Sequence, residues 1–378
     1  MEKKIFNSLG MMSGTSMDGV DISIIKTDGL NYLEKKIDKY YDFPDNLFKK
    51  LINIREKIKS KQDLKTYDIE IKNVEREFTL FHISLIKELI LENEIDIIGF
   101  HGQTIFHSPN EGISFQIGNG KLLSQLVNKT VVYNFRKKDI NNRGQGAPLT
   151  PIYHNLIAKN KFKNPKANTS LYFINIGGIT NMTKIDKSFD ENLMEGYDIG
   201  PGNCLIDSWI RKNSDLKFDT NGKIANSGKL NKLVLNQAID NFQSSNYENS
   251  LDINDFDINF LRGLDFEEGC ATVTEFTAFL ISNGINNLRE KNNDLDLFIF
   301  CGGGRKNKYL LKRIEHYINK KKKFIIKNID DYDTDGDFVE SQAFGYLAVR
   351  SNLNLPISFP KTTRCIKAIS GGEIVKKL

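Results

Sequence analysis

The chain is poor in cysteine. Its 378 residues contain four cysteines, spaced far apart and without a C-x-x-C pair: Cys204, Cys270, Cys301 and Cys365. A disulfide framework and a zinc site are therefore disfavoured, and a reducing compartment such as the cytoplasm is expected.

Long apolar runs and a strong charge of one sign are also missing. No window approaches the roughly 18 apolar residues that span a bilayer, so no membrane partner is expected. The 53 Lys and Arg residues exceed the 48 Asp and Glu residues by only five. This excess is too dilute to argue for nucleic acid. The length predicts a globular protein of about two domains, at roughly 150 residues each.

Several common catalytic motifs are absent. The chain has no G-x-x-x-x-G-K-[ST], and no clean G-x-G-x-x-G joins a strand to a helix. A Walker-type NTPase and a Rossmann dinucleotide site are therefore disfavoured. There is no G-x-S-x-G for a hydrolase nucleophile, and the five histidines lack metal-ligand spacing.

The sequence does contain a repeated pattern of strand, glycine turn and strand. Apolar residues 5–9 precede a polar, glycine-rich turn at 10–19, and residues 20–26 form the second strand. The same pattern returns at 171–185. Two such hairpins are weak evidence for a duplicated lobe.

Further segments complete an α/β pattern. Residues 31–95 are predicted to be amphipathic helices and residues 95–100 a strand. Asn203 is predicted to cap a helix. A third glycine turn joins the strand 297–300 to a helix from Lys308. Strands alternating with helices predict an α/β protein in two lobes.

Three glycine turns have the chemistry of a phosphate site. Glycine lets backbone N–H groups approach a phosphate because no Cβ blocks them, and Ser and Thr add hydroxyl donors. Any one turn alone is adequately explained as a tight turn, but three at strand ends favour a nucleotide site. The turns are Gly14-Thr15-Ser16, Gly177-Gly178-Ile179-Thr180 and Gly302-Gly303-Gly304.

Three aspartates stand beside these turns. Asp18 and Asp21 follow the first turn, where carboxylates suit Mg²⁺ bound through water, or simply stabilise the turn. Asp198 ends an apolar segment just before a Gly-Pro-Gly turn. A fixed position at a strand end suits a general base, with helix capping as the alternative.

An acidic segment gives a further alternative. Asp331, Asp333, Asp335 and Gly336 imitate an EF-hand calcium loop, but Gln342 stands where a bidentate Glu is needed. Calcium binding is therefore the weaker interpretation. The lysine run 320–323 is interpreted as a solvated helix end.

The ordered set of these motifs resembles the anhydro-N-acetylmuramic acid kinase family. Each piece is weak alone, but they follow one another over nearly the whole chain. The matching pieces are 10–21 (GMMSGTSMDGVD), 101–104 (HGQT), 135–136 (FR) with 144–148 (GQGAP), 175–181 (NIGGITN), 198–203 (DIGPGN), 301–305 (CGGGR), 338–347 (FVESQAFGYL), 355–363 (LPISFPKTT) and Gly371-Gly372.

The resemblance implies a two-lobed fold like that of sugar kinases and actin, with ATP and Mg²⁺ in the interlobe cleft. It assigns residues 1–135, completed by 346–378, to the N-terminal lobe and 136–345 to the C-terminal lobe. It implies that water opens the 1,6-anhydro bridge of anhydro-N-acetylmuramic acid while the γ-phosphoryl group moves to O6. The products are N-acetylmuramic acid 6-phosphate and ADP, in cytoplasmic recycling of cell-wall fragments.

The resemblance also carries roles onto individual positions. Asp198 matches the catalytic base. The expected substrate contacts are His101, Gln103, Thr104, Arg136 and Glu340. The expected ATP contacts are Gly14, Thr15, Ser16, Met17, Asp18, Gly19, Val20, Asp21, Gly177, Gly178, Thr180, Gly302, Gly303 and Gly304.

Some positions depart from the family pattern. Asn134 replaces an Asp, Arg143 replaces a Gly, Asn221 replaces an Asp, and Glu248-Asn249 replace Pro-Lys. These changes affect expected sugar contacts and lobe closure more than the reaction class. An actin- or chaperone-like ATPase acting on a protein partner is the alternative function. The oligomeric state is left open, with a homodimer as one alternative.

Overall fold

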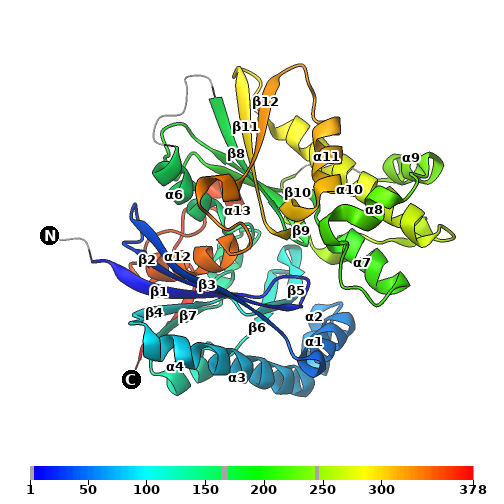
Figure 1. Cartoon of the computed structure of the whole chain (residues 1–378). Coiled ribbons are helices and arrows are strands. Elements are labelled where there is room, and N and C mark those ends of the chain that lie inside the picture. The colour runs from blue at the N-terminus through cyan, green and yellow to red at the C-terminus, as the bar shows by residue number, and fades with distance from the viewer. Residues whose placement is uncertain (1–3, 163–168, 243–246, 378) are drawn as a thin grey trace. The chain divides into compact units, whose positions relative to one another are not determined.

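The computed structural model describes residues 4–162, 169–242 and 247–377, which form two compact units (Figure 1). The first unit is Met1–Lys163, Glu191–Met194 and Phe338–Leu378, and the second is Asn164–Asp190 and Glu195–Asp337. The lobes expected from the sequence differ from these units, because they assign residues 136–163, 191–194 and 338–345 to the C-terminal lobe. Residues 1–3 and 378, at the ends of those lobes, lie outside the described residues.

The first unit is built on a six-stranded sheet in the order β13-β7-β4-β1-β2-β3. β1 pairs antiparallel with β2 and parallel with β4. A separate hairpin, β5–β6, follows β4. The strands are β1 (Phe6–Met12), β2 (Gly19–Thr27), β3 (Leu33–Asp42), β4 (Ile97–Phe100), β5 (Gln103–Ser108), β6 (Ile113–Ile117), β7 (Thr130–Tyr133) and β13 (Glu373–Val375).

Helices cover both faces of this sheet. In Figure 1, α3 and α4 run along one face and α12 along the other. The helices are α1 (Asp45–Lys57), α2 (Lys61–Thr66), α3 (Asp68–Glu92), α4 (Gly120–Val127), α5 (Lys137–Asn141), α6 (Pro151–Lys161), α12 (Val339–Asn352) and α13 (Pro360–Thr363).

Strand β1 explains how the sequence creates the two faces. Alternate residues of a strand point to opposite sides. Leu9 and Met11 are buried in the core cluster that α1 and α3 complete. Gly10 faces α12, where a Cβ would overlap the carbonyl oxygen of Ser341. Glycine is therefore needed at this position for the helix to pack on the sheet.

The second unit has a five-stranded sheet in the order β10-β9-β8-β11-β12. Helix α10 packs Val273, Phe276 and Ile281 into one core with the sheet residues Ile174 and Phe300. The elements are β8 (Thr169–Ile176), β9 (Ile179–Ile185), β10 (Glu195–Pro201), β11 (Leu295–Cys301), β12 (Lys323–Asn328), α7 (Cys204–Asn213), α8 (Lys223–Ser227), α9 (Lys232–Asn241), α10 (Phe266–Leu288) and α11 (Lys308–Tyr317).

The two sheets share one plan. In each, three strands in sequence form an antiparallel meander, and two further strands add in parallel beside the first: β1-β2-β3 with β4 and β7, and β8-β9-β10 with β11 and β12. The duplicated lobe expected from the hairpins is confirmed at this level. The first and second glycine turns thus occupy equivalent positions. The third, after β11, corresponds to the His101 segment after β4.

One element prediction is wrong. Residues 31–95 were expected to be helical throughout, yet Leu33–Asp42 form β3, paired along its length with β2. β3 is an edge strand whose partly exposed surface is rich in Lys and acidic residues. Charged residues on an edge strand discourage pairing with other chains, and they also hide the alternation that would reveal a strand.

Candidate active site

The first glycine turn, between β1 and β2, is held through its carbonyl groups. The Gly14 carbonyl accepts a hydrogen bond from Gln103 Nε2 at 3.0 Å, and the Thr15 carbonyl accepts one from Arg55 Nη1 at 2.7 Å. Met17 donates its N–H to the Gly14 carbonyl and has a φ of 57°. This left-handed conformation is uncommon for a side chain other than glycine and is typical of functional turns.

Carboxylates gather at the exit of this turn. Ser16 Oγ donates to Asp18 Oδ1 at 2.6 Å, and Tyr40 donates its phenolic hydrogen to Asp42 Oδ1 at 3.3 Å. Partial burial, followed by the negative charges of Asp18, Asp42 and Asp21, raises the pKa of Tyr40. The exit is thus an oxygen-rich, negatively charged surface, of the kind that hard cations prefer.

Part of the expected ATP segment belongs to the interior of the fold. Met17 and Val20 are fully buried in the core cluster of the first unit. A Cβ on Gly19 would overlap the Tyr41 carbonyl oxygen. These three residues shape the turn, and their side-chain positions face protein.

In the second unit, the second glycine turn is bonded to the segment that follows β10. Gly202 and Cys204 donate their N–H groups to the Gly178 carbonyl, and Asn203 donates to the Gly177 carbonyl at 2.8 Å. Asn203 occupies the N-cap position of α7 as expected, but its side chain makes no capping bond. Backbone hydrogen bonds therefore fix the second glycine turn against the segment that joins β10 to α7.

The third glycine turn lies beside the second. Gly302 has a φ of 77°, and a Cβ on Gly304 would overlap Ile176 at the end of β8. Both glycines are required by the fold. Thr180 is fully buried, and its hydroxyl donates to the Pro201 carbonyl at 3.1 Å. The Thr180 side chain thus stabilises the turn from inside the unit.

At three other positions of the turns, neither packing nor backbone conformation requires glycine. A Cβ on Gly14, Gly177 or Gly303 would meet its nearest neighbour at 3.7, 3.5 and 3.9 Å, which is ordinary contact or looser. None of the three has a positive φ. The protein itself has room for a side chain at these positions. Their lack of a Cβ therefore fits a group outside the chain that approaches the backbone closely, as a phosphate does.

Asp198 lies near the end of β10, next to the second turn. It is buried, with 6% of its surface exposed, and its Oδ2 accepts the Leu251 backbone N–H at 2.9 Å. An irregularity in the β9–β10 pairing falls between Asp198 and Gly200. A cavity of about 150 Å³ is lined by Ile199, Gly200 and Leu251, among others. The Leu251 amide thus holds one oxygen of the carboxylate in place, and the residues that follow Asp198 line the hollow, whereas Asp198 itself does not.

His101 and Arg136 form the centre of the expected sugar-binding group in the first unit. Arg136 donates to His101 Nε2 from Nε at 3.2 Å and from Nη2 at 3.1 Å, and its Nη1 donates to the Gly146 carbonyl at 2.9 Å. An arginine can only donate, so Nε2 accepts and His101 carries its hydrogen on Nδ1. Nδ1 donates to the Gly102 carbonyl at 2.8 Å. Burial, and then the charge of Arg136, hold the pKa of His101 well below its usual value.

The neighbouring polar residues differ in exposure. Gln103 is fully buried, and its Oε1 has no hydrogen-bond partner among the described residues, although its Nε2 holds the first turn. Thr104 is half-buried, and its hydroxyl accepts from Gln116 Nε2 at 3.1 Å. His107 has its Nδ1 2.8 Å from Ser114 Oγ, and burial lowers its pKa to about 3.

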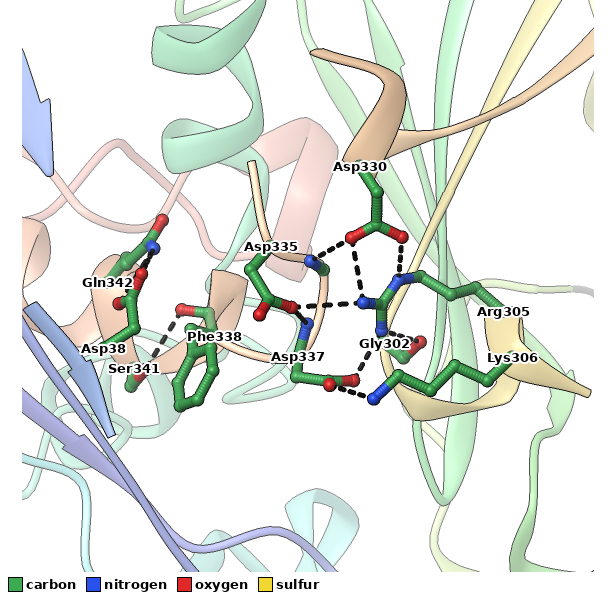
Figure 2. Close-up of polar contacts among 11 residues, drawn as sticks. Asp38, Gly302, Arg305, Lys306, Asp330, Asp335, Asp337, Phe338, Ser341 and Gln342 are labelled. Carbon is green, nitrogen blue, oxygen red and sulfur yellow. Dashed lines mark hydrogen bonds and ion pairs between the residues drawn. The ribbon is translucent and has the colours of Figure 1, made fainter. Parts of the chain in front are cut away.

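Glu340 lies in the first turn of α12, half-buried. The following residues fix this turn to the sheet: Ser341 Oγ and Ser23 Oγ are 2.6 Å apart, and Gln342 Nε2 donates to both oxygens of Asp38 at 3.0 Å. Figure 2 shows the Gln342–Asp38 pair. Glu340 is therefore on a rigidly placed element.

The acidic segment resembling a calcium loop is paired with an arginine. Arg305, which follows the third glycine turn and is 4% exposed, forms ion pairs with Asp330 at 2.7 Å, Asp335 at 3.1 Å and Asp337 at 2.5 Å (Figure 2). Gln342 lies in α12 instead of completing a loop. Within the described residues, no three metal-binding side chains form a metal site. The calcium interpretation is therefore not supported.

Sequence reasoning missed three contributors to these sites. They are the Leu251 amide on Asp198, the Arg305 ion pairs, and Asp139, whose carboxylate accepts the Gly146 N–H at 2.6 Å. None of the three has a clear sequence signal: Asp139 stands between Lys138 and Ile140, as a surface carboxylate would. A backbone amide leaves no trace in the sequence.

Comparison with known proteins gives matches along the whole chain. The model of a family described as anhydro-N-acetylmuramic acid kinase matches residues 6–377. A Pelagibacter ubique (strain HTCC1062) protein of that name is 49% identical over 380 residues, covering 99% of this chain and 99% of its own. A Zymomonas mobilis protein of the same name is 35% identical over 378 residues, covering 97% and 99%.

Solved structures are much less similar to this chain. An activator of 2-hydroxyisocaproyl-CoA dehydratase from Clostridium difficile covers 91% of this chain and 94% of its own, with a TM-score of 0.41 and 11% identity. Such an overlap decides nothing about the site. In the part of the chain that the structure describes, no helix has the length and hydropathy of a membrane span.

Proposed function

The chain belongs to the anhydro-N-acetylmuramic acid kinase family, and we propose that it phosphorylates 1,6-anhydro-N-acetylmuramic acid on O6 with ATP while water opens the anhydro bridge. The products would be N-acetylmuramic acid 6-phosphate and ADP. The reaction would return a cell-wall fragment to metabolism. Because ATP is the donor, we place it in the cytoplasm.

Asp198 is the proposed general base. Its carboxylate takes one proton from a water molecule, and the water oxygen bonds to C1 as the C1–O6 bond breaks. O6 then bonds to the γ-phosphorus as the bond from that phosphorus to ADP breaks. The Leu251 amide at 2.9 Å fixes one oxygen of Asp198, so the carboxylate needs no reorientation before proton transfer.

The glycine turns are the proposed phosphate contacts. The open positions Gly14, Gly177 and Gly303 support this assignment, because their backbone can be approached without meeting a side chain. Mg²⁺, when bound, would neutralise developing charge on the phosphates. Asp18 offers an oxygen ligand of the type that Mg²⁺ prefers, and phosphate oxygens would supply others.

The proposed sugar contacts are Arg136, Gln103, Thr104 and Glu340. The Arg136 guanidinium suits the carboxylate of a muramic acid, because its planar fork matches two oxygens. The buried Gln103 Oε1 is an acceptor that a sugar hydroxyl would satisfy. Both ring nitrogens of His101 have protein partners, so His101 would orient Arg136 instead of contacting the sugar.

The geometry of Asp198 is the observation that carries the mechanism, and its replacement tests it. Asp198→Asn keeps the shape and loses the basic carboxylate, so turnover of the anhydro sugar should fall by about 10²- to 10⁴-fold. ATP binding and the circular dichroism spectrum should be unchanged. Asp257→Asn, an exposed carboxylate of the same unit, is the matched control and should keep full activity.

An actin- or chaperone-like ATPase is not favoured, because the family match spans the chain. That function predicts ATP hydrolysis stimulated by a protein partner, with no phosphorylated sugar. Full turnover by Asp198→Asn would remove the base assignment. Phosphorylated sugar from the wild type would still support the kinase.

A further inference from the structure

A buried carboxylate organises the loop that follows α5 in the first unit. Asp139 and Thr363 are both fully buried. Three successive amides, those of Gly144, Gln145 and Gly146, donate to the Asp139 carbonyl at 2.9 Å, the Thr363 carbonyl at 2.6 Å and Asp139 Oδ2 at 2.6 Å. These two residues therefore determine the conformation of residues 144–146.

The second oxygen of Asp139 is also engaged. Thr363 Oγ1 donates to Asp139 Oδ1 at 2.6 Å, across 224 positions of sequence. Burial raises the pKa of Asp139, while hydrogen bonds from Thr363 and Gly146 lower it. A buried carboxylate is costly unless its oxygens are hydrogen-bonded. Both oxygens of the Asp139 carboxylate accept hydrogen bonds, and these bonds fix the geometry of the loop.

Two glycines allow the loop to adopt this geometry. A Cβ on Gly144 would overlap the Asp139 carboxylate, and Gly146 has a φ of 72°. In this conformation the Gly146 N–H faces Asp139, and its carbonyl accepts from Arg136 Nη1 at 2.9 Å. The other side of the guanidinium donates to His101. Arg136 is thus clamped between His101 and a carbonyl that Asp139 sets in place.

We propose that Asp139 and Thr363 are positioning residues for substrate recognition, acting through the Gly146 carbonyl on Arg136. The inference rests on the proposed function, in which Arg136 contacts the sugar. It gives the C-terminal segment around α13 a role in the site, because Thr363 supplies two of the contacts. It also explains why a Gly-rich loop follows α5.

Thr363→Val and Thr363→Ser form the matched pair that tests this. Valine keeps the shape and removes the hydroxyl, whereas serine keeps the hydroxyl. Thr363→Val should raise the KM for the anhydro sugar by about tenfold, because a hydrogen bond to a charged group is lost, and should leave the KM for ATP unchanged. Thr363→Ser should restore the wild-type KM for the sugar.

A double-mutant cycle separates positioning from general damage. In an Arg136→Ala background, Thr363→Val should have no further effect on the KM for the sugar. An equal effect in both backgrounds, or equal changes in the KM values for ATP and sugar, would overturn the proposal. Asp139→Asn is the second variant, with the same selective rise expected, in case Thr363→Val yields no folded protein.

A measurement that needs no enzyme turnover tests this inference separately from the proposed function. In nuclear magnetic resonance spectra, the Arg136 Nε–H hydrogen bonded to His101 should give a slowly exchanging signal. The signal should be lost in Thr363→Val and kept in Thr363→Ser. Its persistence in Thr363→Val would contradict the positioning role, whatever substrate the enzyme accepts.

Discussion

Several site residues act by holding other groups. Arg55 and Gln103 hold the carbonyls of the first turn, and His101 accepts from Arg136. Their side chains look like ligand contacts in the sequence, because His, Arg and Gln are common in binding sites. Only the hydrogen-bond pattern distinguishes the residue that contacts a ligand from the residue that orients it.

One residue-scale departure from the family pattern has a physical consequence. Arg143 is exposed and has a φ of 59°, a left-handed conformation in which a Cβ is strained. Arg143→Gly should therefore raise the free energy of unfolding by about 0.5 to 1 kcal/mol. Chemical denaturation measures this.

Lys138→Gly is the control for that change. Lys138 is exposed within α5, where glycine should lower the free energy of unfolding by about 1 kcal/mol. Destabilisation by both substitutions would show that the backbone argument for Arg143 fails.

At the scale of elements, the glycine turns divide into two classes. Gly304 is required by packing against Ile176, whereas Gly177 has space for a Cβ. Gly177→Ala should leave the free energy of unfolding within about 0.5 kcal/mol of wild type. It should weaken ATP binding by about tenfold, because the new methyl group stands where a phosphate would approach.

Gly304→Ala gives the opposite pattern. The overlap with Ile176 should lower the free energy of unfolding by about 1 to 3 kcal/mol. Calorimetric titration with ATP and thermal melting together separate the two classes. Wild-type ATP affinity in a folded Gly177→Ala protein would count against the phosphate assignment.

Sequence patterns predicted the elements that are apolar and bounded by glycine. The strands β1, β2, β4, β8, β9 and β11 and the helix α11 lie where they were expected. β3 was missed because its surface is charged and it lies at a sheet edge. The β5–β6 hairpin was also missed, and its two short strands are only partly buried. Pattern reasoning depends on burial, and it fails where burial is partial.

At the scale of the first unit, buried histidines make stability depend on pH. Burial lowers the pKa of His82 to about 4 and those of His107 and His154 to about 3, and it lowers the pKa of His101 well below its usual value. Below about 6.5, the pKa of an unfolded histidine, the unfolded state binds more protons. The free energy of unfolding should therefore decrease as the pH is lowered below about 6.5, by roughly 1.4 kcal/mol per histidine per pH unit.

Denaturant melts between pH 7 and pH 5 measure this slope. The raised pKa of Asp139 contributes with the opposite sign, but it is one group against four histidines. His82→Phe keeps a ring beside Phe78 and Phe100 and removes one titrating group, so its slope should be shallower. A wild-type protein equally stable at both pH values would contradict the account.

The long-range pairs of the molecule lay beyond sequence reasoning. Asp139 meets Thr363 across 224 positions, and Asp198 meets the Leu251 amide across 53. Composition and periodicity describe neighbours along the chain. The motif order predicts which residues share a function, but the contacts that orient them depend on the completed fold.

The fate of the water oxygen tests the central claim most directly. The enzyme is incubated briefly with ATP, Mg²⁺ and 1,6-anhydro-N-acetylmuramic acid in water enriched in heavy oxygen, and the phosphorylated product is analysed by mass spectrometry. Unlabelled product kept in the same water corrects for exchange at C1. The account predicts heavy oxygen at C1 and none in the phosphate ester. Label in the phosphate, or ADP formed without a phosphorylated sugar, would contradict it.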